Sequence, residues 1–287
     1  MTPLSQGLHP SGVQVIYSDL DGTMVGPRGC FFRAEDEAIS LEPARALADL
    51  LAAGVALVLI SGRSQAQLLE AAGIFGADGY VAELGAMVSW SSGGTSRGRH
   101  LLRGAMPEHY DTIPEELVAG MLREYARKLE FHDPWHLGHE LDVMLRGLVD
   151  VAEVDAWLAD QGAAWLRLHD NGLLPARPTP GLDLDMGADQ LHVYHLVPDG
   201  IDKGRAVAYD LARRGLRAEQ AIAIGDSASD LAMALHVGRF HLVSNGARSA
   251  PVRALAEAAP NVVIEDQALG LGWASAVRSA LTRSTLS

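Results

Sequence analysis

The chain has 287 residues, a formal net charge of −13 at pH 7 and one cysteine, Cys30. This acidity disfavours general binding to nucleic acid or to an anionic membrane, so any phosphate site must be made positive locally. A single cysteine excludes an intrachain disulfide, which fits a reducing cytoplasm. The first dozen residues lack the features of a signal peptide, and no apolar run is long enough to span a bilayer.

The stretch 13–25, VQVIYSDLDGTMV, joins an apolar run to two aspartates one residue apart, Asp19 and Asp21. A short apolar, β-branched run that ends in a turn signal predicts a buried strand. In an open α/β sheet, ligands bind beyond the carboxyl ends of the strands, and side chains at i and i+2 point to the same side. Both carboxylates can therefore face one ligand, whereas Leu20 points into packing. Gly22 lets the chain turn sharply and lets backbone N–H groups approach an anion.

The pattern of predicted helices and strands differs between the first, middle and last parts of the chain. The first part contains predicted helices at 43–53 and 65–72 and strands at 55–60 and 80–82. The middle part contains a hairpin from 86–90, helices at 114–129 and 151–161, and strands at 141–145 and 165–169. The last part contains strands at 191–196, 221–224, 239–243 and 262–264 and helices at 203–214, 253–258 and 273–282. We predict an α/β fold with a doubly wound parallel-sheet core, 1–86 and 188–287, and an inserted α+β cap domain, 87–187.

Polar side chains stand at three predicted strand ends and one helix start: Asp19 and Asp21, Ser61, Asp226 and Asp230, and Lys203. The carboxyl ends of parallel strands share one edge of the sheet, so we expect these groups to converge. Crowded carboxylates require a hard divalent cation, most simply Mg²⁺. Lysine, serine and backbone N–H groups suit a phosphoryl group, and one aspartate can act as a nucleophile.

Each feature alone also has a structural interpretation. Ser61 can cap the next helix, and Lys203 can be a solvated residue of a first helical turn. Asp226 and Asp230 can be loop acids on either side of Ser229, which is a good helix N-cap. We favour the chemical interpretation because all four features occur together, each beside its own strand end or helix start.

Four segments together resemble the haloacid dehalogenase-type phosphotransferase superfamily: DLDGT at 19–23, SGR at 61–63, DKG at 202–204 and GDSASD at 225–230. The place of the insert is similar to the large type IIB cap of the branch that contains the Cof-type, sucrose-phosphate and mannosyl-3-phosphoglycerate phosphatases. This resemblance implies that Asp19 attacks phosphorus and forms an aspartyl-phosphate. It implies that Asp21 protonates the leaving oxygen and later activates water, and that Ser61 and Lys203 complete the catalytic set.

The resemblance also implies two binding sets. The phosphate set is Leu20, Gly22, Thr23, Ser61, Gly62 and Lys203. The Mg²⁺ set is Asp19, Asp21 through its backbone carbonyl, Asp226 and Asp230, the last of which orients the metal shell. Two positions depart from the family pattern, because Ser229 and Leu84 stand where relatives usually carry asparagine.

Three histidines of the insert have the spacing of a helical metal face: His132, His136 and His139. Pro134 and Gly138 argue against a regular helix there, so we favour loop or substrate-facing histidines over a metal site. The predicted site residues of the core bind metal and phosphate. The candidates for contacts with the rest of the substrate are Arg63, Arg146 and His169.

We expect a Mg²⁺-dependent phosphomonoester hydrolase, located in the cytoplasm as a monomer or homodimer. Its substrate is expected to be a small phosphorylated metabolite, a sugar phosphate or a glycosyl-phosphoglycerate, with no nucleic-acid or membrane partner. Two alternatives remain: a phosphomutase of the same superfamily, and a non-catalytic binding protein on this fold. Retention of the motif residues together speaks against the second alternative.

Overall fold

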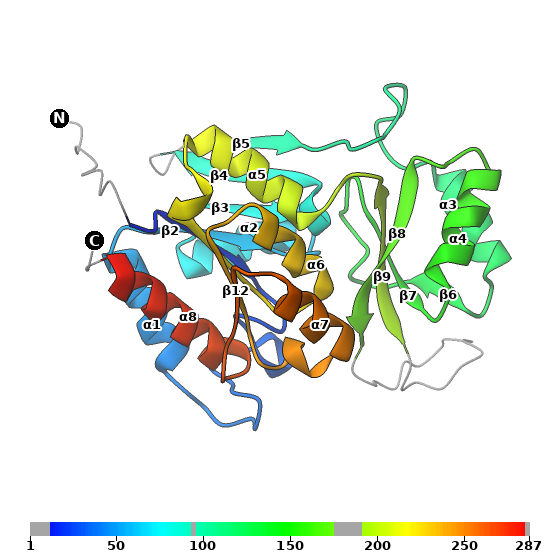
Figure 1. Cartoon of the computed structure of the whole chain (residues 1–287). Coiled ribbons are helices and arrows are strands. Elements are labelled where there is room, and N and C mark those ends of the chain that lie inside the picture. Colours follow the sequence, from blue (N-terminus) through cyan, green and yellow to red (C-terminus); the bar gives the residue numbers. More distant parts are fainter. Residues whose placement is uncertain (1–11, 93–95, 175–190, 285–287) are drawn as a thin grey trace.

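The computed structural model describes residues 12–92, 96–174 and 191–284, which form two β-sheets with their helices. The larger sheet has eight strands in the order β12-β11-β10-β1-β2-β3-β4-β5, and the smaller has four in the order β6-β7-β9-β8. The smaller sheet lies beside one end of the larger unit, and its helices lie on the side away from it (Figure 1). The predicted α/β fold class, with a doubly wound core and an α+β insert, is confirmed.

Six neighbouring strands of the larger sheet are parallel: β12 (Val262–Ile264), β11 (Arg239–Leu242), β10 (Ala221–Gly225), β1 (Val15–Asp19), β2 (Ala56–Ile60) and β3 (Gly79–Ala82). Two antiparallel strands, β4 (Met87–Ser92) and β5 (Ser96–Leu101), extend the edge beyond β3. All five residues of β1 are buried, and the strand pairs with β10 on one side and β2 on the other. The carboxyl end of β1 therefore lies in the middle of the sheet edge, flanked by two other strand ends.

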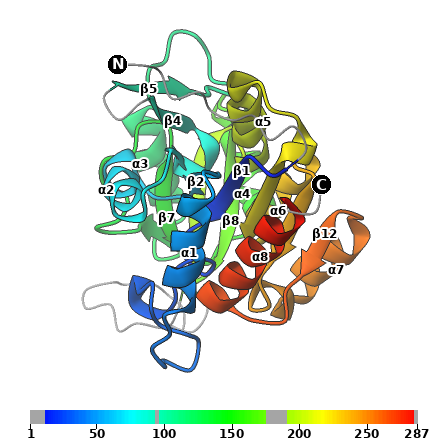
Figure 2. The same ribbon diagram turned by 90° about the vertical axis from the view of Figure 1, so that its left-hand side faces the viewer.

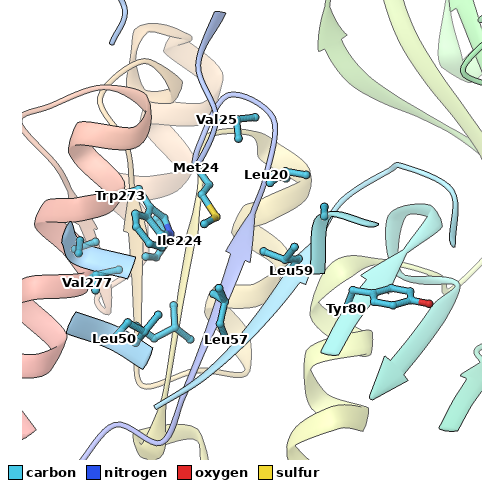
Figure 3. Close-up of a cluster of buried hydrophobic side chains, with 14 of the residues drawn as sticks. Leu20, Met24, Val25, Leu50, Leu57, Leu59, Tyr80, Ile224, Trp273 and Val277 are labelled. Carbon is cyan, nitrogen blue, oxygen red and sulfur yellow. The ribbon is translucent and has the colours of Figure 1, made fainter. Parts of the chain in front are cut away.

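Helices cover both faces of this sheet. One face is covered by α1 (Glu42–Ala52), α2 (Gln65–Phe75) and α8 (Leu269–Ser284); Figure 2 looks onto α1 and α8. The other face is covered by α5 (Lys203–Arg214), the short α6 (Ala228–Leu231) and α7 (Ala250–Ala258). Leu57 packs with Leu50 and Trp273 in the first cluster (Figure 3), whereas the next residue, Val58, packs with Val207 in the second. This alternation is the geometry of a strand that is buried on both faces.

The smaller sheet consists of β6 (Leu129–Phe131), β7 (Val143–Gly147), β8 (Leu166–Leu173) and β9 (His192–Pro198), with each strand antiparallel to its neighbours. Two helices, α3 (Glu115–Glu124) and α4 (Val151–Asp160), cover one face of it. Leu145, Leu168 and Tyr194 pack in one buried cluster on that face. The opposite face is turned toward the larger sheet (Figure 1).

Sheet membership differs from the predicted domain boundaries. The prediction assigns β4 and β5 to the insert, yet β4 pairs with β3 and β5 pairs with β4 in the larger sheet. It assigns β9 to the core, yet β9 lies between β7 and β8 in the smaller sheet. The chain therefore enters the insert after Leu101 and returns just before Lys203, and the predicted connection at 84–86 lies within the larger sheet. The second predicted connection, 188–190, lies outside the described residues.

Burial explains both differences. Tyr194 and Leu196 of β9 pack under the insert helices, whereas Val197 packs with Ala86 of the core. Because both faces of β9 are covered, its sequence resembles that of a buried parallel strand. The β4–β5 pair alternates in polarity because it is an antiparallel extension at the sheet edge, and such a pattern resembles a separate hairpin.

Local backbone geometry accounts for one further difference. The predicted helix 114–129 ends at Glu124, and Leu129 instead begins β6. Arg127 adopts a left-handed conformation with φ 67°, which turns the chain out of the helix although the apolar spacing continues. None of the described helices combines the length and apolar character that a membrane span needs.

Candidate active site

The carboxyl edge of the larger sheet brings the four predicted motifs together. Asp19 is the last residue of β1, Ser61 follows β2, Asp226 follows β10, and Lys203 is the first residue of α5. The Lys203 ammonium lies 2.8 Å from Oδ1 of Asp19 and 2.6 Å from Oδ1 of Asp230. The predicted convergence of these residues therefore occurs, although they are far apart in the sequence.

Lys203 and its two carboxylates form a buried charge cluster. The side chains of Lys203 and Asp230 are 3% and 0% exposed, so neither charge is compensated by water. Burial alone would lower the pKa of Lys203, but Asp19 and Asp230 raise it above its ordinary value. Burial and the Asp230 charge raise the pKa of Asp19 well above its ordinary range, although Lys203 opposes this. One lysine thus leaves the cluster short of positive charge.

Asp226 is held by two side chains beside the first loop. Its Oδ1 accepts a hydrogen bond from Oγ1 of Thr23 at 3.2 Å, and its Oδ2 accepts one from Nδ2 of Asn245 at 3.2 Å. Nδ2 of Asn245 also donates to the carbonyl of Gly22 at 2.8 Å. A Cβ at Gly22 would lie 2.4 Å from Oδ2 of Asp226, and the φ of Gly22 is +85°, so only glycine fits there.

Asn245 is absent from the sequence-based site. It follows β11, whose carboxyl end lies at the same edge, and its side-chain Oδ1 accepts from the N–H of Leu269 at 2.9 Å. Its position just beyond the carboxyl end of a fourth strand could have identified Asn245 as a site residue from the sequence.

Asp230 has no free oxygen toward the site. Its Oδ1 accepts from Lys203, and its Oδ2 accepts from the N–H of Asp226 at 3.1 Å, the N–H of Ser227 at 2.9 Å and the Ser227 hydroxyl at 2.6 Å. Asp230 is thus engaged with protein donors, which suits the orienting role that the resemblance implies better than direct coordination.

The donor set fits a hard divalent cation. One carboxylate oxygen each of Asp19, Asp226 and Asp230 lies within 4.8 Å of the others. Oδ2 of Asp19 is buried and lacks a hydrogen-bond partner within the described part of the chain. Burial and the Asp230 charge raise the pKa of Asp226 to about 7. The ionised forms of both carboxylates are therefore disfavoured. A bound Mg²⁺ would stabilise them by supplying positive charge and by taking carboxylate oxygens as ligands.

The Ser61–Arg63 loop lies beside these acids. The hydroxyl of Ser61 accepts from the N–H of Arg63 at 3.2 Å, and helix α2 is capped by Ser64 instead, through a capping box with Gln67. Arg63 binds both oxygens of Asp21, from Nε at 2.7 Å and from its terminal amine at 2.6 Å. The Asp21 side chain is half exposed, so this pair can exchange with a ligand at low cost, about 1 kcal/mol or less for exposed pairs.

The remaining predicted residues occupy different places. Leu20 packs in the hydrophobic core, so only its backbone can contact a phosphate. Arg146 and His169 lie on the core-facing side of the smaller sheet, because their neighbours Leu145 and Leu168 pack under the helices. Nε of Arg146 lies 2.6 Å from Glu130 on the same sheet.

The two positions that depart from the family pattern have clear environments. The Ser229 hydroxyl donates to Oδ1 of Asn171 in β8 at 3.1 Å, so it links core and insert. Leu84 and its neighbour Glu83 both adopt left-handed conformations, with φ 56° and 54°. Asparagine tolerates that conformation better than leucine, so Leu84 carries backbone strain.

The three insert histidines do not form a metal site in the described residues, where the acidic group at the sheet edge is the sole candidate set. Nδ1 of His139 instead lies 2.9 Å from Oδ2 of Asp142, and the same carboxylate oxygen lies 2.6 Å from Nδ1 of His195. Burial lowers the pKa of His132 to about 4, which keeps that ring neutral.

Sequence comparison finds similarity to one protein family over part of the chain. Residues 179–262 match the family model described as haloacid dehalogenase-like hydrolase, and this segment contains Lys203, Asp226 and Asp230. A search of curated proteins gave no significant match. The match and the fold confirm the predicted resemblance to haloacid dehalogenase-like hydrolases, and with it the prediction of an enzyme of this type.

Solved structures share the fold over nearly the whole chain. The sucrose-phosphatase of Synechocystis, solved with sucrose and phosphate, has a TM-score of 0.64 and 15% identity over 94% of this chain and 98% of that chain. A Thermoplasma acidophilum protein has a TM-score of 0.64 and 15% identity over 94% and 99%. A haloalkanoate-superfamily phosphatase from Bacteroides thetaiotaomicron has a TM-score of 0.61 and 15% identity over 98% of both chains.

The raised pKa of Asp226 predicts a pH-dependent stability without metal. An acid whose folded pKa lies above its unfolded value binds more protons when folded, so its contribution falls as pH rises from about 4 to about 7. His132 acts oppositely, because its folded pKa is lowered and its penalty fades as pH rises. His132 is present in both wild type and Asp226→Asn, so its contribution cancels when their melting temperatures are compared at each pH. In EDTA, the melting temperature of wild type relative to this variant should fall by several degrees between pH 4.5 and 7.5.

Mg²⁺ provides the control for this measurement. It should raise the wild-type melting temperature more at pH 7.5 than at pH 5, and it should raise that of Asp226→Asn much less. The melting temperature of wild type minus that of Asp226→Asn should thus fall with pH in EDTA. A difference that rises with pH would contradict the raised pKa of Asp226.

Proposed function

We propose that this chain is a Mg²⁺-dependent phosphomonoester hydrolase that acts on a small phosphorylated metabolite, in the class of sugar phosphates or glycosyl-phosphoglycerates. The observation that carries the proposal is the state of Asp19, a buried carboxylate at a central strand end with one oxygen held by Lys203 and the other unpartnered. Asp19 has two carboxylate oxygens, so one can attack phosphorus while the other is held by a cation. The structural likeness to a sucrose-phosphatase supports the substrate class.

The residues divide the reaction between them. The Asp19 carboxylate attacks phosphorus while the P–O ester bond breaks, which gives an aspartyl-phosphate and an alkoxide leaving group. Asp21 gives its proton to the leaving oxygen, then accepts a proton from the water that hydrolyses the acyl-phosphate. For the first transfer, Asp21 must release at least one of its two bonds to Arg63.

Three further groups support this chemistry. Lys203 holds the nucleophile in place and offsets negative charge as it builds on the phosphoryl oxygens. The Ser61 hydroxyl and the loop amide of Gly62 are available for phosphoryl oxygens. Asp19, Asp226 and the Asp21 backbone would hold Mg²⁺, whose chemistry is to neutralise phosphoryl charge and to align the phosphorus with the nucleophile.

A panel of phosphorylated metabolites tests the proposal through phosphate release. Activity should disappear in EDTA and return with Mg²⁺, because the crowded carboxylates need a small cation of fixed geometry. Ca²⁺ should support it poorly, since its looser coordination does not align the reacting atoms. Full activity after exhaustive chelation would exclude the metal assignment. A requirement for a bisphosphate activator, without net phosphate release, would instead indicate the phosphomutase alternative.

A further inference from the structure

The core-facing side of the smaller sheet presents a buried histidine that the proposed chemistry leaves unused. His195 of β9 is fully buried and lies directly across from Met144 of β7 and His169 of β8. Its neighbours Tyr194 and Leu196 pack under the insert helices. Side chains alternate along a strand, so the His195 ring points the opposite way, toward the core.

The ring reaches the loop between β2 and α2. A Cβ built on Gly62 would lie 2.6 Å from Cε1 and 2.7 Å from Nε2 of His195, so the imidazole rests on the backbone of Gly62. The residues on either side are Ser61 and Arg63, and Arg63 binds Asp21. A side chain of the insert therefore touches the centre of the proposed phosphate loop.

Asp142 fixes the orientation of this ring. Oδ2 of Asp142 lies 2.6 Å from Nδ1 of His195, and both side chains are 0% exposed. Although burial alone would raise it, His195 and His139 hold the pKa of Asp142 below its ordinary value. A carboxylate at this distance keeps the proton on Nδ1, which leaves Nε2 as the free polar atom of the ring.

Nε2 of His195 is buried and makes no hydrogen bond within the described part of the chain. Buried polar atoms are nearly always paired, and each exception requires an explanation. Here the atom lies against Gly62, in the loop that is proposed to hold phosphoryl oxygens, where a ligand oxygen would give it a partner.

The loop that carries Asp142 is tied to the same region of the core. Oε2 of Glu83 accepts from the N–H of Glu140 at 2.9 Å and of Leu141 at 2.8 Å. The N–H of Glu83 donates to the carbonyl of Arg63 at 3.1 Å. Asp142 is thus placed relative to the phosphate loop through one continuous set of bonds, and His195 is placed with it.

We propose that His195 binds the phosphoryl group of the substrate, with Nε2 donating a hydrogen bond to an oxygen held at Ser61 and Gly62. Because Nδ1–H is bonded to Asp142, donation from Nε2 uses the imidazolium, and Asp142 supplies the countercharge. The inference rests on the proposed function and adds an insert-borne group to its phosphate site. It distinguishes His195 from Arg146 and His169, which are candidates for the non-phosphate part of the substrate.

Two substitutions separate the two nitrogen atoms of the ring. His195→Asn keeps an amide nitrogen near the position of Nδ1 but leaves nothing at Nε2, whereas His195→Gln extends an amide toward the position of Nε2. We expect His195→Asn to lower kcat/KM by about 10- to 100-fold, the range for a hydrogen bond to a charged group. The loss should be similar for p-nitrophenyl phosphate and for a sugar phosphate, and it should be smaller for His195→Gln.

Inorganic phosphate gives a readout that does not depend on turnover. Calorimetry in the presence of Mg²⁺ should show phosphate binding weakened by a similar factor in His195→Asn. The matched control is His192→Asn, which removes a histidine of the same strand that pairs with Asp170 at 2.7 Å on the opposite face. This control should leave phosphate binding and kcat/KM unchanged.

Unchanged phosphate binding and kcat/KM in folded His195→Asn would overturn the inference, as would a loss confined to the larger substrate. Thermal unfolding identifies variants that do not fold; in that case Asp142→Asn, which keeps the side-chain volume, carries the same test and should also weaken phosphate binding. A wild-type protein without phosphatase activity would refute the proposed function instead, and the calorimetric comparison would still decide the role of His195.

Discussion

Replacing Asp19 by asparagine should abolish turnover and leave the protein folded. An amide cannot form an acyl-phosphate, so no intermediate is available to the reaction. Burial and the Asp230 charge raise the pKa of Asp19, which means that its ionised form is unfavourable in the metal-free protein. The neutral amide can still accept from Lys203. The melting temperature in EDTA should therefore equal or exceed that of wild type, and phosphate release should be undetectable.

Two other variants make this result specific. Asp49→Asn changes an exposed aspartate of α1 and should leave the rate unchanged. Asp21→Asn should keep the nucleophile and lose only acid–base assistance, a factor of roughly 10² to 10⁴. That loss should be smaller for an aryl phosphate, whose leaving oxygen needs less help from an acid. A near-wild-type rate in Asp19→Asn would show that the nucleophile is misassigned.

Replacing Lys203 by methionine should destabilise the protein severely and remove activity. Methionine has a similar length but no charge, so Asp19 and Asp230 would lose the cation that lies within 2.8 Å of each. Breaking a buried ion pair from one side costs about 3–5 kcal/mol, because the partner charge stays buried. Chemical denaturation should show a loss of this size at pH 8.

The other lysine of the chain, Lys128, is exposed and supplies the control. Lys128→Met should change stability little. The double variant Lys203→Met with Asp230→Asn removes one charge of each sign, so it should recover part of the lost stability without recovering activity. Additive losses in the double variant would mean that the two side chains do not interact as the structure indicates.

Most of the catalytic edge was predictable because strand ends are strongly marked in this sequence. The apolar run before Asp19 and the run before Ser61 each end in a turn signal, and parallel strands bring such ends to one edge. The convergence of Ser61 and Asp226 with Asp19 follows from this topology, whereas Lys203 starts a helix that follows a strand of the smaller sheet. The particular partners do not follow from the topology, since the pairing of Lys203 with Asp230 and the release of Ser61 from helix capping depend on side-chain packing.

The insert was less predictable for a physical reason. His195 lies in an apolar strand whose pattern also suits a core strand, and Asp142 lies in a loop between two elements. Their contact depends on the pairing of β7 with β9 and on how the smaller sheet packs against Gly62. Neither property leaves a periodic signal in the sequence. The strand β9 was therefore assigned to the wrong sheet, and its histidine was overlooked.

The position of β1 has a consequence for synthesis on the ribosome. Ile16 in β1 pairs with Ile222 in β10. More than half of the chain must therefore be synthesised after β1 before this edge of the strand is paired. The strands of the smaller sheet all emerge before β10, so we expect that unit to fold first. Asp19 would meet Lys203 only when the long-range pairing closes, a slow kind of contact. A nascent chain would thus expose an unpaired hydrophobic strand edge, which makes this interval the one in which a chaperone matters most.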